Sequence, residues 1–134
     1  MEATANRTRT RRTVPQNDGQ CGVVCINDAK VARARAAAPA ADALQRIADR
    51  FGALADPTRL RILHALSGAE LCVCDLATVA ARSMPATSQQ LKLLRGLGLV
   101  KFRIDGKLAY YSLADDWVRS ALREALPVPG GTRR

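Results

Sequence analysis

The sequence is poor in aromatic residues and contains a single histidine. Aromatic residues make up 4% of the 134 positions, too few for the stacked platform that binds single-stranded nucleic acid. The lone His64 lies in a helical pattern with no evident nucleophile to activate, which argues against a hydrolase. No apolar run reaches the roughly 20 residues of a membrane span, and no apolar segment with a cleavage site follows the basic start. We therefore expect a cytoplasmic protein that is not an enzyme.

Acidic residues are also scarce relative to basic ones. The chain has 12 Asp and Glu against 21 Lys and Arg, which gives a net charge of +9 and an isoelectric point near 10.3. This balance favours a polyanionic partner, either a nucleic acid or an anionic membrane surface. A membrane surface is the weaker alternative, because no predicted helix sets one basic face against one large apolar face.

Cysteine occurs four times, as Cys21, Cys25, Cys72 and Cys74. Thiols stay reduced in the cytoplasm, so these residues are better interpreted as ligands or redox groups than as two disulfides. Thiolates suit soft or borderline cations such as Zn²⁺, Cd²⁺ and Pb²⁺, whereas Mg²⁺ and Ca²⁺ prefer oxygen. A thiol oxidoreductase usually has C-x-x-C near a βαβ unit, and neither is present.

The stretch "ELCVCDLA" places two cysteines one residue apart. In a regular helix, residues two apart point about 200° away from each other. Cys72 and Cys74 can therefore approach one ion only if Cys72 still lies in extended backbone, where residues two apart share a side. We predict that this helix begins near Val73 or Cys74.

Two helices are expected before this stretch. Leu44, Ile47, Phe51 and Leu54 form an apolar stripe from Asp42 onward. The next helix has Asp56 as its N-cap and Pro57 in its first turn, and it ends at Ser67-Gly68. We expect its buried face to contain Leu60, Leu63 and Leu66.

A helix-turn-helix is expected next. The helix in "ELCVCDLATVAARS" would bury Val73, Leu76 and either Val79 or Ala80. The helix in "SMPATSQQLKLLRGLGLV" would have Ser83 as N-cap and Pro85 in its first turn, bury Leu91 and Leu94, and end at Gly98. Two short helices joined by a tight turn are typical of this motif.

The segment "LVKFRIDGKLAYYSL" predicts a β-hairpin around Asp105-Gly106, and a last helix follows, capped by Asp115 and apolar at Val118, Leu122 and Leu126. The predicted fold class is mainly α with a small β-hairpin wing, a winged helix-turn-helix. We expect residues 1–20 to form a flexible basic arm, residues 21–126 the winged helix-turn-helix domain, and residues 127–134 a disordered tail.

The second helix of a helix-turn-helix lies in the major groove, and a cationic wing adds contacts to the DNA backbone. Gln pairs with adenine, Ser and Thr reach several bases, and Lys and Arg bind phosphate. The predicted DNA-binding residues are Thr87, Ser88, Gln89, Gln90, Lys92, Arg95, Lys101, Arg103 and Lys107.

The order and spacing of "LADPTRLRIL", "ELCVCDLA", "SQQLKLLRGLGLV" and "DGKLAYYSL" resemble the ArsR/SmtB family of metal-sensing repressors, and its CadC branch in particular. The resemblance runs from about Cys21 to Leu126. It implies a homodimer that binds double-stranded operator DNA as apo protein and is released by Cd²⁺ or Pb²⁺, with Zn²⁺ a further candidate. It also implies a metal site in which Cys21 and Cys25 of one protomer join Cys72 and Cys74 of the other.

Some relatives carry a second, zinc-type site on the last helix; here Trp117 replaces the expected histidine, so we predict that this site is absent. The resemblance favours a dimer interface over intramolecular packing for the apolar residues Leu44, Ile47, Phe51, Leu54, Trp117, Val118, Leu122 and Leu126. Three alternatives stay open for the cysteines. They are a site for arsenite or antimonite, a thiol-redox sensor on the same fold, and a permanent zinc site that braces the fold.

Overall fold

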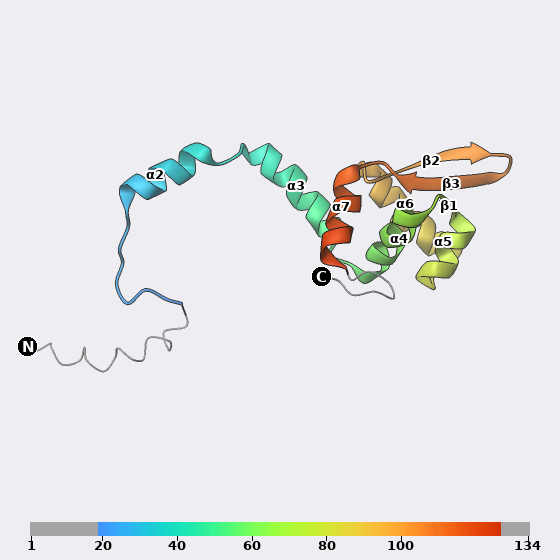
Figure 1. Cartoon of the computed structure of the whole chain (residues 1–134), viewed down its shortest axis with the longest axis horizontal. Helices are drawn as coiled ribbons and strands as arrows, with labels where there is room; N and C mark the ends of the chain where they lie inside the picture. The colour runs from blue at the N-terminus through green and yellow to red at the C-terminus, as the bar shows by residue number, and fades with distance from the viewer. Residues whose placement is uncertain (1–18, 127–134) are drawn as a thin grey trace, which may run out of the picture. The chain divides into compact units, whose positions relative to one another are not determined.

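The structure is a computed structural model that describes residues 19–126 (Figure 1). The chain divides into two compact units, the first ending at Pro39 and the second beginning at Ala40. Residues 21–39, which we grouped with the winged helix, thus fall in the first unit. The expectations for residues 1–18 and for the tail at 127–134 lie outside the described residues. No helix within the described range is long and apolar enough to span a bilayer.

In the described part of the first unit, residues 19–39, there is one helix, α2, Asp28–Ala37. Asn27 caps it, with its side-chain oxygen accepting a hydrogen bond of 3.0 Å from the Lys30 amide. No residue of α2 is buried. Residues 19–27 before it are irregular, so Cys21 and Cys25 lie in a loop rather than on one face of a helix.

The second unit has the expected order of helices followed by a hairpin, with one additional strand. Its elements are α3 (Ala41–Ala53), α4 (Pro57–Gly68), β1 (Leu71–Cys72), α5 (Val73–Ala80), α6 (Met84–Gly96), β2 (Val100–Asp105), β3 (Leu108–Leu113) and α7 (Asp116–Ala125). The helix-turn-helix is α5 and α6, and the wing is the β2–β3 hairpin. The fold is a winged helix-turn-helix, as the sequence predicted.

Each predicted N-cap satisfies backbone amides that would otherwise lack a partner. Asp56 accepts from the Arg59 amide at 3.0 Å, Ser83 from the Ala86 amide at 3.1 Å, and Asp115 from the Trp117 amide at 2.8 Å. These caps fix the first turns of α4, α6 and α7, and they confirm the predicted starts of the three helices.

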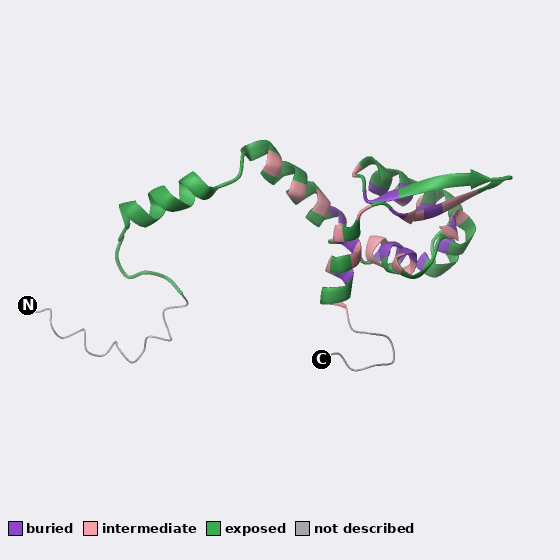
Figure 2. Cartoon of the chain, turned by 45° about the horizontal axis from the view of Figure 1, so that its top comes forward, coloured by how far each residue is buried: buried purple, intermediate pink, exposed green. Residues whose placement is uncertain are grey.

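The sheet has the antiparallel strand order β1-β3-β2. Asp105 pairs with Leu108, so the two-residue hairpin loop is Gly106-Lys107, one position later than the predicted Asp105-Gly106. Gly106 has φ +66°, a conformation that glycine adopts at no steric cost. The far end of the hairpin stands clear of the helices and is exposed (Figure 2).

The core lies between the helices and the base of the sheet. Its largest fully buried apolar side chains are Ile62, Leu63, Leu76, Leu91, Leu94, Leu99 and Val118. Burial of each leucine contributes about 1.5–3 kcal/mol. The core confirms the expected inward positions of α6, Leu91 and Leu94.

One predicted burial pattern is wrong in part. On α4, Ile62 rather than Leu60 is fully buried; Leu60 packs at the edge of the core because it lies on the flank of the buried stripe. On α5, the structure decides between the two predicted alternatives: the small residue Ala80 is buried and Val79 is exposed. An alanine allows α5 to approach its neighbours closely where a valine would fill the same space.

Candidate DNA-binding surface and cysteine site

The outer face of α6 carries most of the predicted base- and phosphate-binding residues. Ser88, Gln89, Lys92 and Arg95 are exposed. The Arg95 guanidinium lies 5.0 Å from the centre of the Phe102 ring, so the wing supports this side chain. These four residues remain available to contact DNA.

Thr87 was predicted to contact DNA, and this prediction is wrong. Its side chain is 0% exposed, and its hydroxyl donates a 2.9 Å hydrogen bond to the Ser83 carbonyl. The physical reason is helical period: Thr87, Leu91 and Leu94 are spaced by four and three residues and occupy the same inward face. Thr87 is a core residue.

Gln90 is half-buried and is held by a residue that sequence reasoning missed. Arg59 of α4 donates to the Gln90 side-chain oxygen at 3.2 Å through Nη1 and to the Ala53 carbonyl at 2.9 Å through Nε. Arg59 therefore connects the recognition helix to the α3–α4 junction. No sequence signal identifies this contact, because the pair is separated by 31 residues.

The wing presents the three predicted cations, which differ in whether they form an ion pair. Lys101, Arg103 and Lys107 are all exposed. In the part of the chain that the structure describes, neither lysine forms an ion pair, whereas Arg103 donates two hydrogen bonds of 2.8 Å to Glu70. These hydrogen bonds lower the pKa of Glu70 from its ordinary value. Glu70 had no predicted role, although it opens the "ELCVCDLA" stretch.

The cysteine pair lies at a strand-to-helix junction. Cys72 ends β1 and is the N-cap of α5, with extended backbone at φ −83° and ψ 170°. This confirms the predicted helix start near Val73 or Cys74, and the structure places it at Val73. The Cys72 side chain is buried, at 8% exposed, and that of Cys74 is exposed.

Cys21 and Cys25 are exposed in the first unit, and all four cysteines are free thiols. Across residues 19–126, no group of three or more His, Cys, Asp or Glu side chains forms a preassembled metal site. The predicted set draws its ligands from two protomers. The donor chemistry of the four thiols fits a soft cation.

The apolar residues assigned to a dimer interface differ in exposure. Leu44 and Phe51 of α3 are 49% and 57% exposed. Val118 and Leu122 are buried in the protomer's own core, so they have no surface left for a second subunit and leave the predicted set. The other four predicted interface residues, Ile47, Leu54, Trp117 and Leu126, are half-buried.

Aromatic and charged contacts connect α3 to α7. The Phe51 and Trp117 rings meet edge to face with centroids 5.3 Å apart, and the Arg50 guanidinium lies 5.0 Å over the Trp117 ring. Arg50 also forms an ion pair with Asp115, the N-cap of α7. Trp117 is thus a packing residue. His64 is exposed on α4.

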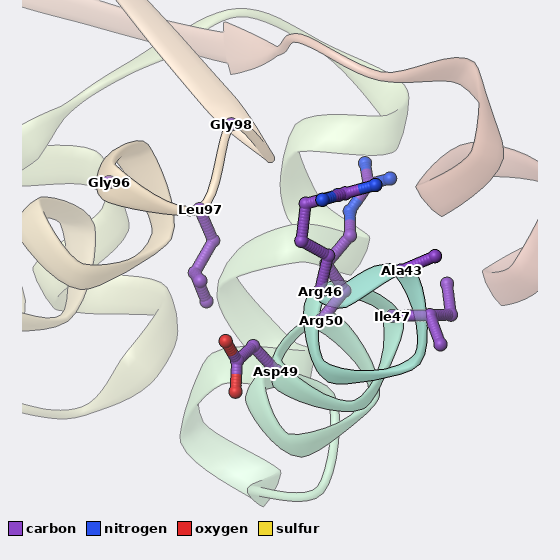
Figure 3. Close-up of a pocket in the computed structure, with 8 residues that line it drawn as sticks. All are labelled: Ala43, Arg46, Ile47, Asp49, Arg50, Gly96, Leu97 and Gly98. Atoms are coloured by element: carbon purple, nitrogen blue, oxygen red, sulfur yellow. The ribbon is translucent and has the colours of Figure 1, made fainter. Parts of the chain in front are cut away.

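A pocket of about 540 Å³ lies between α3 and the end of α6. Figure 3 shows α3 residues on one side of it and the turn after α6 on the other. Its lining residues are Ala43, Arg46, Ile47, Asp49, Arg50, Gly96, Leu97 and Gly98. α3 is therefore only partly covered by its own protomer, and Ala53 is its one buried residue.

Comparison with known proteins identifies the fold's relatives. Residues 56–101 match the family described as "Bacterial regulatory protein, arsR family". The chain is 52% identical over 83 residues to a transcriptional repressor SmtB homolog of Synechocystis sp., covering 62% of this chain and 63% of that protein. It is 41% identical over 106 residues to a cadmium resistance transcriptional regulatory protein CadC homolog of Staphylococcus aureus, covering 78% of this chain and 87% of that protein.

Among solved structures, a homodimeric winged helix-turn-helix DNA-binding domain from Mycobacterium bovis superposes with a TM-score of 0.58 at 32% identity. The match covers 63% of this chain and 82% of that one.

Proposed function

The chain belongs to the arsR family of bacterial regulatory proteins, and from this premise we propose that it is a metal-responsive transcriptional repressor. It binds double-stranded operator DNA as a cytoplasmic homodimer, and a soft divalent cation releases it. Its relatives are transcriptional regulators, not enzymes. The observation that carries the proposal is the presence, in one unit, of an exposed recognition face on α6 and a thiol pair at the start of α5.

DNA binding would use α6 in the major groove. Gln89 is the exposed side chain that can pair bidentately with adenine, and Ser88 beside it can reach a base edge. Lys92, Arg95 and the wing lysines would contact phosphates, which set affinity and its salt dependence rather than sequence preference. A positively charged chain of +9 supports this mode of binding.

A second copy of the chain would cover α3. The stripe of Leu44, Ile47 and Phe51 is exposed at Leu44 and Phe51 and half-buried at Ile47, and it continues on α7 through Trp117 and Leu126. A homodimer places two recognition helices at a fixed spacing, as a two-fold operator requires. The homodimeric state of the Mycobacterium bovis domain supports this arrangement.

The metal-binding residues would be Cys72 and Cys74 together with Cys21 and Cys25 of the partner subunit. Four thiolates suit Cd²⁺, Pb²⁺ or Zn²⁺ and exclude hard cations. The bound cation would supply a fixed link between an arm and the start of the partner's α5. This link shifts the two recognition helices away from the operator spacing, so metal and DNA weaken each other's binding, with a coupling of about 1–3 kcal/mol.

The test is fluorescence anisotropy of a labelled fragment taken from the DNA upstream of the gene itself. Reduced apo protein is titrated first, and Cd²⁺, Pb²⁺, Zn²⁺ or arsenite is then added with and without chelator. We expect Cd²⁺ or Pb²⁺ to release the DNA, chelator to restore binding, and Cys74→Ser to abolish release. His64→Ala, which alters another exposed soft-metal donor, is the matched control and should respond as the wild type does.

Each alternative predicts a different result in the same assay. Release by arsenite in preference to Cd²⁺ identifies a three-thiolate sensor. Release by oxidant, reversed by reductant without metal, identifies a thiol-redox sensor. A metal-saturated dimer that binds the operator as tightly as the apo dimer contradicts the proposed function and leaves the cysteines with a structural role.

A further inference from the structure

The strand that carries Cys72 is part of the same sheet as the wing. Cys72 of β1 pairs with Tyr110 of β3, and Tyr110 pairs with Arg103 of β2. Directly opposed residues of antiparallel strands share a face of the sheet, so these three residues form one row across it. β1, which carries Cys72, is thus joined through β3 to β2, the wing strand that carries Arg103.

Glu70, immediately before β1, reaches the other end of this row. Its two carboxylate oxygens accept hydrogen bonds of 2.8 Å each from Nε and Nη2 of Arg103. The same guanidinium lies 5.0 Å from the centre of the Tyr110 ring. Its Nη1 is 3.6 Å from Asp105, a longer and weaker contact. A parallel pair of charge-assisted hydrogen bonds fixes both position and orientation of Arg103.

This arrangement changes what the wing offers to DNA. Lys101 and Lys107 have no anionic partner within residues 19–126, so a phosphate can approach them directly. Arg103 has two of its donors engaged with a carboxylate, and a phosphate oxygen must displace Glu70 to receive them. Glu70 and the DNA backbone are therefore competitors for one guanidinium.

We propose that Glu70 regulates the wing by this competition, and that metal at the cysteine site favours the Glu70-bound state. Metal on Cys72 fixes β1, the strand that positions Glu70, and thiolates near the same row add negative charge that holds Arg103 on the protein. Metal binding then removes a phosphate contact as well as altering the spacing of the recognition helices. The proposal has two parts. The effect of metal on the competition, its metal half, rests on the proposed function, whereas the competition between Glu70 and DNA for Arg103 is a property of the apo protein.

The first test uses reduced, metal-free protein and measures operator affinity over a range of salt concentrations. Glu70→Gln should bind about five- to tenfold more tightly at low salt, and its log–log salt slope should steepen by up to about 0.9, the value for one full phosphate contact. Arg103→Gln should bind more weakly than wild type, because the apo protein already makes this contact part of the time. The double variant should match Arg103→Gln, because the gain passes through Arg103.

Asp105→Asn is the matched control, since it removes one negative charge beside Arg103 without removing the paired hydrogen bonds. We expect less than about a twofold gain in affinity from it, as for a weak exposed ion pair. If Glu70→Gln and Asp105→Asn gain equally in operator affinity, the effect is explained by net charge alone and the proposal is overturned. Weaker binding by Glu70→Gln overturns it as well, because Glu70 would then position Arg103 for DNA.

The second test adds Cd²⁺ and follows metal loading by thiolate-to-metal ultraviolet absorbance, so that each variant is compared at equal occupancy. The ratio of apo to Cd²⁺-loaded operator affinity should fall about threefold or more in Glu70→Gln. An unchanged ratio overturns the metal half while the proposed function stands. If the wild type responds to no metal, the proposed function and the metal half fail together, and the apo salt slopes alone decide the competition.

Discussion

Thr87 tests the assignment of residues on α6, because a threonine can serve either as a core residue or as a base-contacting residue, and not as both. Its hydroxyl donates to the Ser83 carbonyl at 2.9 Å, and that carbonyl also accepts from the Thr87 amide at 2.9 Å. Thr87→Val keeps the branched shape, removes one buried hydrogen bond and leaves the carbonyl satisfied. We expect a loss of at most about 1.5 kcal/mol in the free energy of unfolding. A loss of 1 kcal/mol corresponds to a melting temperature about 4–8 °C lower in a domain of this size.

Operator affinity should stay within about twofold of wild type in Thr87→Val. A base contact through this hydroxyl would instead be worth about 1–3 kcal/mol, or roughly 5- to 150-fold in affinity. Thr87→Ser is the companion variant: it keeps the hydroxyl and removes a buried methyl group, at a cost of about 1 kcal/mol in stability.

Thermal unfolding and operator titration of both variants are compared with Gln89→Ala, which changes an exposed residue of the same helix. Affinity should fall in Gln89→Ala alone, without a loss of stability. The core assignment of Thr87 is refuted if Thr87→Val loses affinity at unchanged stability while Thr87→Ser retains it.

Three further predictions concern the dimer, the α3–α7 junction and the wing. Leu44→Glu places a charge on the exposed stripe of α3 and should raise the dimer dissociation constant at least about 100-fold with unchanged circular dichroism. A dimer dissociation constant equal to that of the wild type in sedimentation velocity would contradict the proposed interface. Asp115→Ala loses both the α7 cap and the partner of Arg50, and should cost about 1–2 kcal/mol in denaturant unfolding, whereas Asp115→Asn retains a cap and should cost less. Gly106→Ala forces a side chain into φ +66° and should cost about 1 kcal/mol, and a neutral result would show that the hairpin loop adopts another conformation.

The sequence predicts those features that depend on neighbouring residues. Asp56, Ser83 and Asp115 cap the helices they precede, and the two β-prone runs around Gly106 form the hairpin. Caps, turns and helical periods operate over a few residues, so one sequence contains all the information they need. The start of α5 at Val73 follows from the same kind of local argument about Cys72.

Other features depend on contacts between distant segments. β1 has two residues, too few to show an alternating pattern, and it exists because β3 pairs with it. The ion pair of Glu70 with Arg103 spans 33 residues. Burial of Val118 and Leu122 depends on where α7 packs, since an apolar helix face can serve either the core or an interface. No spacing rule could have supplied these contacts.

The strand order β1-β3-β2 leaves β2 as an edge strand. Its unpaired main-chain groups can form hydrogen bonds with an extended segment of another chain. The side chain of Ile104, 63% exposed, adds an apolar contact that favours such association. Lys101, Arg103 and Asp105 alternate along the same strand, and a second strand would have to align with this row of charges. The charged side chains of the wing therefore protect the protein from edge-to-edge aggregation, a constraint on their replacement that has nothing to do with DNA.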